Sequence, residues 1–158
     1  MKKIALLVLI SCGFAAHAAD NLKFHGTLIA PPNCTISNDQ TIEIEFGNVL
    51  INKIDGTNYA KDVPYTITCD STVRDDSMAM TLTLSGSATS FNQAAIGTTV
   101  TGLGIEIQQD NQPFTLGSTI PVNEQSIPKL KAVPVKQSGV ALQEGDFDAT
   151  ATLQVEYQ

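Results

Sequence analysis

The sequence has few basic residues, few histidines and no tryptophan. Its 158 residues include 9 Lys and Arg against 16 Asp and Glu, which gives a formal net charge of −7. Nucleic acid and anionic membrane surfaces repel such a chain, so we exclude both as main partners. Two histidines are a thin supply for acid–base or metal chemistry. We therefore expect no enzymatic activity, no cofactor and no metal site.

The first 18 residues have the organisation of a secretory signal peptide. Residues 1–3 are basic at two positions, residues 4–16 form an apolar run, and Ala16-His17-Ala18 is a small-x-small cleavage site. The apolar run is too short to span a bilayer, so we expect no direct membrane insertion. We expect cleavage after Ala18. The alternative is lipidation of Cys12, which would leave an unusually short signal.

Two cysteines, Cys34 and Cys69, remain in the predicted mature chain. In an oxidising compartment such a pair most often forms a disulfide, here across a loop of about 35 residues. The alternatives are a metal site and a catalytic thiol. A metal site would need further ligands and a catalytic thiol would need a base, and His25 is the one histidine left after cleavage.

Apolar and polar residues alternate with a period of two along most of the mature chain, which is typical of β-strands. Clear alternations begin at Ile42, Val63, Met78 and Ile105, and turn-forming residues separate them. Many short strands with one apolar face each predict an all-β fold, most simply an antiparallel sandwich. A short stretch at 92–96 is also compatible with a helix.

The longest alternation is at the C-terminus. It begins at Gly145, after which every even-numbered residue is polar. The apolar odd-numbered residues are Phe147, Ala149, Ala151, Leu153, Val155 and Tyr157. One face of this predicted strand must be buried. The sequence given contains no further strand to pair with its far edge.

The start of the mature chain carries a separate alternation. Leu22, Phe24, Gly26 and Leu28 alternate with polar residues, and Pro31-Pro32 then interrupts strand pairing. The alternation alone allows this segment to be the first strand of the same sandwich. It also allows a strand that is donated to another molecule.

Four features occur together over the mature chain. They are the tail 21–28 with its internal glycine, Cys34 just after Pro31-Pro32, Cys69 at the end of the alternating segment 63–69, and a C-terminal pattern with Gly145 fourteenth from the end and Tyr157 penultimate. This combination resembles pilin subunits of the chaperone–usher pathway, and most of all the minor subunits of P-type fimbriae.

The resemblance implies an incomplete immunoglobulin-like β-sandwich that lacks its last strand. It divides the chain into a signal peptide (1–18), an N-terminal donor-strand extension (19–32) and a pilin domain (33–158). It further implies that a periplasmic chaperone fills the open groove with a strand of its own. At an outer-membrane usher, the tail of a neighbouring subunit then replaces that strand, and the subunit becomes part of a fimbria at the cell surface.

The resemblance also assigns roles to individual residues. The donor strand would use Leu22, Phe24, Gly26 and Leu28. The acceptor groove and chaperone contact would comprise Gly145, Phe147, Ala149, Ala151, Leu153, Val155 and Tyr157. The function implied is that of a structural subunit in a head-to-tail polymer. A secreted immunoglobulin-like binding module, or an adhesin component, is the alternative.

Overall fold

The computed structural model describes residues 22–70 and 79–157. The predicted signal peptide, Cys12, the start of the tail, Met78 and Gln158 lie outside these residues. The chain divides into two units between Ala30 and Pro31, two residues before the predicted boundary. In the first unit, residues 22–30 form no regular secondary structure and every side chain is exposed. Among the described residues, no helix is long and apolar enough to cross a membrane.

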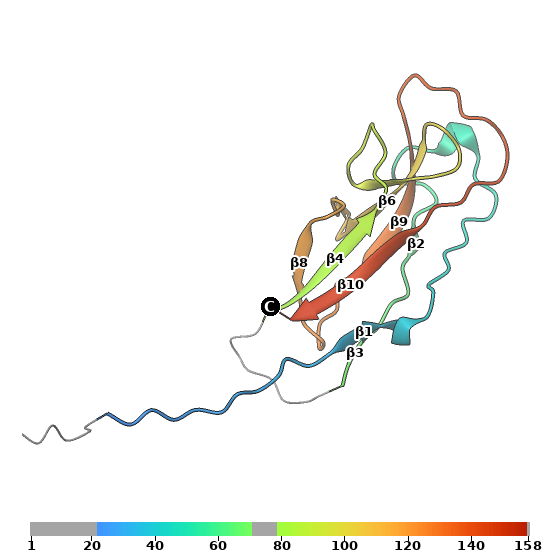
Figure 1. Ribbon diagram of the computed structural model, residues 1–158. Coiled ribbons are helices and arrows are strands. Elements are labelled where there is room, and N and C mark those ends of the chain that lie inside the picture. The colour runs from blue at the N-terminus through green and yellow to red at the C-terminus, as the bar shows by residue number, and fades with distance from the viewer. Residues whose placement is uncertain (1–21, 71–78, 158) are drawn as a thin grey trace, which may run out of the picture. The chain divides into compact units, whose positions relative to one another are not determined.

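The second unit consists of short antiparallel strands in three sheets (Figure 1). The first sheet pairs β1 (Cys34–Ile36) with β3 (Ile67–Cys69). The second has the order β10 (Ala151–Tyr157), β4 (Met80–Gly86), β8 (Thr119–Val122). The third has the order β2 (Lys61–Asp62), β9 (Leu130–Lys136), β6 (Leu103–Gln109), β5 (Ala95–Gly97), and β7 (Gln112–Pro113) pairs with β6. The helical elements of the described residues are two 3₁₀ turns, Ser37–Asp39 and Ile51–Lys53.

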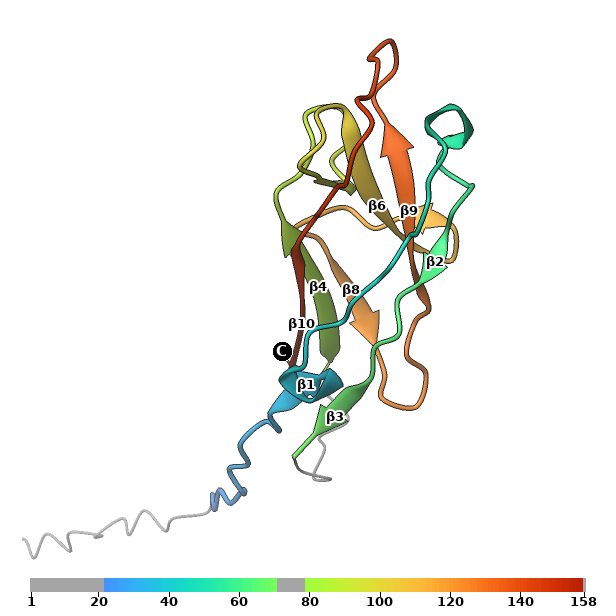
Figure 2. The ribbon, with the colours of Figure 1, turned by 90° about the vertical axis from the view of Figure 1, so that its right-hand side faces the viewer.

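The core lies between the apolar faces of the second and third sheets, which form two layers (Figure 2). Leu82 and Leu84 of β4 are buried, as are Ile105 and Ile107 of β6. Their alternation with more polar neighbours is the pattern that predicts a half-buried strand. Tyr65 is also buried, and its hydroxyl donates to the carbonyl of Pro128 (2.5 Å). Burial raises the pKa of Tyr65 to about 12.

Two predicted strands differ from the structure in their pairing. The segment 40–50 is not part of any ladder, although its apolar residues face inward. Ile42, Ile44 and Phe46 are half-buried, while the side chains between them are exposed. The expected face is therefore right and the expected strand pairing is wrong. Alternation reports which face is buried and does not report a hydrogen-bonding partner.

The C-terminal strand is shorter than predicted, because its ladder begins only at Ala151. Its partner β4 ends at Gly86, which pairs with Ala151, so residues 145–150 continue past the end of the sheet. The helix-compatible stretch 92–96 instead forms a turn that leads into β5. The sandwich remains all-β.

A tight loop between the second 3₁₀ turn and β2 is built around one carboxylate. Asp55 Oδ1 accepts from the backbone N–H of Asn58 (2.8 Å) and of Thr57 (2.9 Å), and Oδ2 accepts from the Asn58 amide (2.7 Å). Gly56 has a φ of 83°, which glycine adopts readily. The hydrogen bonds from Asn58 and Thr57 lower the pKa of the exposed Asp55 to about 2.

We expect this loop to loosen only in strong acid. A lowered pKa means that the carboxylate stabilises the loop at all pH values above about 4 and loses that contribution as the pH falls through about 2. The protection of the Thr57 and Asn58 amides from hydrogen exchange, relative to an unstructured chain at the same pH, should therefore fall at low pH. Asp55→Asn should accelerate exchange already at pH 6, whereas Asp62→Asn, a matched change outside the loop, should not. Unchanged exchange in Asp55→Asn would contradict this account.

Candidate functional site

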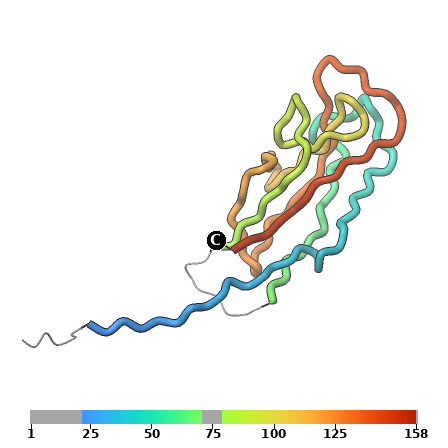
Figure 3. The backbone as a smooth tube through the Cα atoms, in the orientation of Figure 1, coloured from blue at the N-terminus to red at the C-terminus, as the bar shows by residue number. Residues whose placement is uncertain are grey.

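The second unit contains an open groove with a volume of about 1600 Å³. Two segments far apart in the sequence form its walls, residues 40–52 and residues 142–156. Both run along the same side of the domain (Figure 3). The groove is therefore elongated and bounded by two lengths of extended chain.

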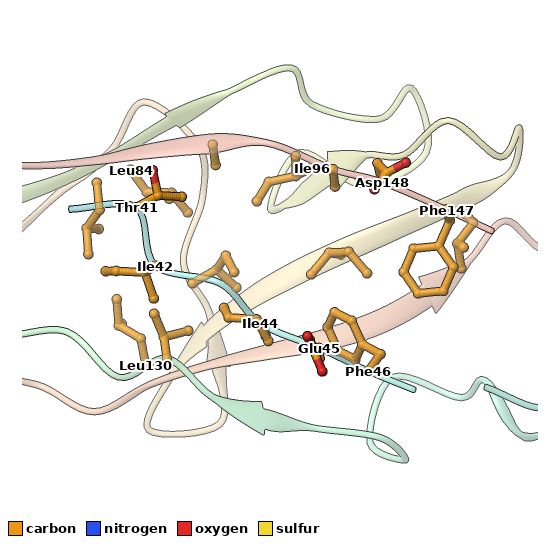
Figure 4. A pocket seen from close by; sticks show the side chains of 18 of the residues that line it. Thr41, Ile42, Ile44, Glu45, Phe46, Leu84, Ile96, Leu130, Phe147 and Asp148 are labelled. Carbon is orange, nitrogen blue, oxygen red and sulfur yellow. The ribbon is translucent and has the colours of Figure 1, made fainter. Parts of the chain in front are cut away.

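The floor of the groove is formed by side chains of the apolar core, all of them buried. It comprises Leu84 of β4, Ile96 of β5, Leu103, Ile105 and Ile107 of β6, and Leu130 and Ala132 of β9. The ladders β4–β10 and β6–β9 fix the positions of these side chains. Several of them point toward the groove in Figure 4. Any occupant must accordingly present apolar groups to this floor.

Neither wall is paired on the side that faces the groove. Within the described residues, β10 pairs only with β4, and the segment 40–50 pairs with no strand. Residues 145–150 have one local anchor, where Asp148 O accepts from Thr99 N (3.0 Å) and Thr99 Oγ1 accepts from Asp148 N (3.1 Å). Two extended edges with polar backbone groups thus flank an apolar floor, which is the arrangement that favours strand addition.

The structure brings most of the predicted groove residues together along the second wall. Gly145, Phe147, Ala149, Ala151, Leu153 and Val155 all line the groove. Val155 is buried, while Ala149 and Ala151 remain exposed although they are apolar. Tyr157 is not among the lining residues and packs against the core instead.

The first wall was missed as part of the site by sequence reasoning. Ile42, Ile44 and Phe46 line the groove together with the exposed Leu50. The alternation of these residues predicts a strand, but nothing in it indicates that the segment faces the second wall.

An aromatic pair connects the two walls. The rings of Phe46 and Phe147 lie with their centroids 5.9 Å apart at a tilt of 43° (Figure 4). This separation is within the range of favourable aromatic contacts. The two walls are therefore in side-chain contact at this point.

A disulfide lies at the other end of the groove. Cys34 and Cys69 are directly opposite each other in the β1–β3 ladder and form the predicted disulfide. The neighbouring Asp70 accepts from the backbone and side chain of Asn33 (2.9 and 3.1 Å). Glu124 has a carboxylate oxygen within 4.8 Å of both sulfurs. Because the sulfurs are bonded to each other, they are not available as metal-binding or catalytic thiolates.

The predicted donor residues are exposed in the tail. Leu22, Phe24 and Leu28 have exposed fractions of 74%, 87% and 101%. Gly26 has no neighbour within 4 Å of the position that a Cβ atom would take. Exposed alternating apolar residues of this size are typical of a segment that binds a partner.

A family model described as "Fimbrial protein" matches residues 22–158, which include the tail, both walls and the floor of the groove. The chain belongs to the fimbrial protein family. Among its relatives, the uncharacterized fimbrial-like protein YfcQ of Escherichia coli (strain K12) is 49% identical over 162 residues. The alignment covers 100% of both chains.

Solved structures of fimbrial subunits share its fold. The P pilus adaptor subunit PapF is 28% identical, with a TM-score of 0.56, and the match covers 81% of this chain and 97% of that chain. The P pilus rod subunit PapA is similar in fold, with a TM-score of 0.59 at 22% identity, over 79% of this chain and 99% of that chain.

These findings confirm the central sequence prediction. The chain is a structural fimbrial subunit of the chaperone–usher type, with an incomplete immunoglobulin-like sandwich. Membership of the fimbrial family places it among exported proteins of surface fimbriae. The family is one of structural proteins, in keeping with the expectation that the chain is not an enzyme.

Proposed function

We propose that this subunit polymerises by strand exchange. The groove accepts a β-strand from another protein, and residues 19–32 serve as the strand that the subunit donates to its neighbour. One observation carries the proposal: two unpaired extended edges face each other across an apolar floor. A strand laid between them would form main-chain hydrogen bonds and complete the sandwich.

The apolar residues of the tail suit this role. Leu22, Phe24 and Leu28 are separated by even numbers of residues, so in a strand they all point to one face. Each would contribute roughly 1.5–3 kcal/mol on full burial against the floor of a neighbouring groove. Because strands added head to tail do not close into a ring, the product is a fibre.

The aromatic pair offers a reason for the glycine in the tail. Phe46 and Phe147 both line the groove and contact each other across it, so a strand inserted along the groove would have to pass their rings. Gly26 has no side chain to accommodate there. Nothing around Gly26 in its own tail requires a glycine, since the space beside it is open. Its role is therefore better explained by the partner's groove.

The open groove also explains why assembly needs helper proteins. An exposed apolar groove with unpaired edges promotes aggregation, so the subunit needs a temporary occupant after export. A periplasmic chaperone would supply that strand, and an outer-membrane usher would exchange it for the tail of the next subunit. Export would depend on the signal peptide 1–18, and the residues of the second wall would form the chaperone contact.

We expect Phe24→Asn to abolish most donor activity of the tail. The change removes apolar burial and places an amide on an apolar floor, so insertion should weaken by about 100-fold or more. Labelled peptides of residues 19–32 are added to the mature subunit, co-purified with the chaperone of its own gene cluster, and inserted peptide is measured by gel filtration.

Thr27→Asn is the matched control, because it places the same side chain on the polar face of the peptide. It should insert within about threefold of the wild-type peptide. Equal insertion of Phe24→Asn and Thr27→Asn would contradict the proposed role of the apolar face. Absence of insertion by every peptide would contradict the role of this tail as a donor to a groove of this kind.

A further inference from the structure

We infer that an acidic rim around the groove selects donor strands with a cationic outer face, and that the tail of a second copy of this chain is such a strand. The inference rests on the proposed strand exchange and adds to it the basis of donor selection. It is based on two observations: carboxylates line the groove, and a lysine alternates with the apolar residues of the tail.

The groove carries carboxylates and no cations. We use the name acidic rim for the six charged residues that line it: Asp39, Glu45, Glu144, Asp146, Asp148 and Glu156. All six are exposed, and the adjacent Glu43 is exposed as well. Among the described residues, no lysine, arginine or histidine lines the groove, although Lys136 Nζ donates to Ile51 O at one end of the first wall (3.0 Å). The charged side chains that line the groove itself are therefore all carboxylates.

The absence of cations extends along both walls. Residues 33–52 and 137–157 contain no lysine, arginine or histidine. The described lysines of the domain are instead in other segments, at Lys53, Lys61, Lys129, Lys131 and Lys136. Cations are thus present on the domain, and they are absent from the two segments that an incoming strand must approach.

The tail 19–32 contains one acidic residue, Asp20, and one lysine, Lys23, and the lysine alternates with the apolar donor residues. Lys23 is the only charged side chain in residues 22–30 when His25 is neutral, and both alternate with the apolar donor residues. In a strand whose apolar face points to the floor, Lys23 and His25 point outward. Directly opposite positions on neighbouring strands have Cβ atoms about 4.5–5.5 Å apart. Lys23 would therefore be on the same outer face as the exposed carboxylates of the walls.

Exposed charge pairs affect association more than final stability. Such a pair adds little to equilibrium stability, because water and salt screen it. A groove with charge of one sign nevertheless attracts an oppositely charged strand and repels a like-charged one during encounter. Discrimination should consequently be found in the rate of insertion and in its dependence on salt.

The experiment compares three labelled peptides of residues 19–32: wild type, Lys23→Gln and Lys23→Glu. Their insertion rates into the mature subunit, held by its chaperone, are measured at low and high salt. At low salt we expect Lys23→Glu to insert about tenfold more slowly than wild type, with Lys23→Gln in between. At about 0.5 M salt the three rates should agree within about twofold.

A charge reversal in the groove tests the same contact from the other side. Asp146→Lys in the subunit should restore much of the rate of the Lys23→Glu peptide and slow the wild-type peptide. Asp62→Lys is the matched control, since it makes the same change at an exposed residue that does not line the groove. It should leave the ranking of the peptides unchanged.

The outcomes separate this inference from the proposed function. Equal rates for the three peptides at low salt would overturn the inference and leave strand insertion intact. Insertion by none of them would overturn the assignment of a second copy of this chain as the donor. The second-copy assignment is tested with the mature chain alone. It should form concentration-dependent oligomers after release from the chaperone, more slowly with Lys23→Glu, and the absence of oligomers would overturn it.

Discussion

Val155→Asp is expected to destabilise the domain strongly, whereas Gln154→Asp is expected to leave its stability nearly unchanged. Val155 is 7% exposed and pairs in the ladder with Leu82, which is 0% exposed. A carboxylate at this position would have no cationic partner in the apolar core, and such burial costs several kcal/mol. Whole domains are stable by only about 5–15 kcal/mol. Gln154 is exposed on the opposite face of the same strand, so the same substitution there adds a solvated charge.

Urea denaturation of the disulfide-bonded chain, followed by far-UV circular dichroism, measures the effect. We expect Val155→Asp to lower the free energy of unfolding by about 4 kcal/mol and Gln154→Asp by less than about 0.5 kcal/mol. Similar midpoints for the two variants would mean that β10 does not bury this face. The described shape of the groove would then be wrong, because β10 forms part of its second wall.

The strands that bury one face inside the domain could be predicted from the sequence. Apolar residues recur at every second position in residues 80–84 and 103–107, and both segments form strands of the sandwich. The two cysteines could be paired from composition and compartment alone. Periodicity indicates that one face of a segment is buried. It predicts a strand correctly where that face packs against the chain's own core.

The predictions of strand pairing were wrong for segments whose apolar face lines the groove. Residues 40–50 and 145–150 alternate as strongly as real strands, yet neither segment has a ladder partner among the described residues. Alternation cannot distinguish a strand with a partner in the same chain from one whose partner is another molecule. Residues 40–50 lie in one wall of the groove and residues 145–150 are part of the other, so both errors fall in the candidate site.

Contacts between the walls could not be predicted. Phe46 and Phe147 are about a hundred residues apart, and nothing near either residue indicates the other. Their contact depends on how three sheets pack. The acidic rim is similar, because its members come from two distant segments and become one feature only in the folded domain. Long-range packing of this kind is not encoded in local periodicity.

Removal of the disulfide is expected to lower the free energy of unfolding by about 4 kcal/mol. The bond joins residues 35 positions apart, and cross-linking a loop of that length restricts the unfolded chain by about this amount. It also joins strands of only three residues each, so the β1–β3 sheet has few other contacts to hold it. The first wall of the groove follows directly after β1, and its position depends on this sheet.

The double variant Cys34→Ala, Cys69→Ala tests the effect in urea, with the reduced wild-type chain beside it. If the bond acts mainly by restricting the unfolded state, the two should agree within about 1 kcal/mol, because both lack the cross-link and keep the rest of the core. Insertion of the tail peptide should also weaken in both, since a loosened β1 no longer holds residues 40–50 in place. Full stability of the double variant would show that the ladder alone holds β1, and the groove would then owe its shape to the core packing of Ile42 and Ile44 instead.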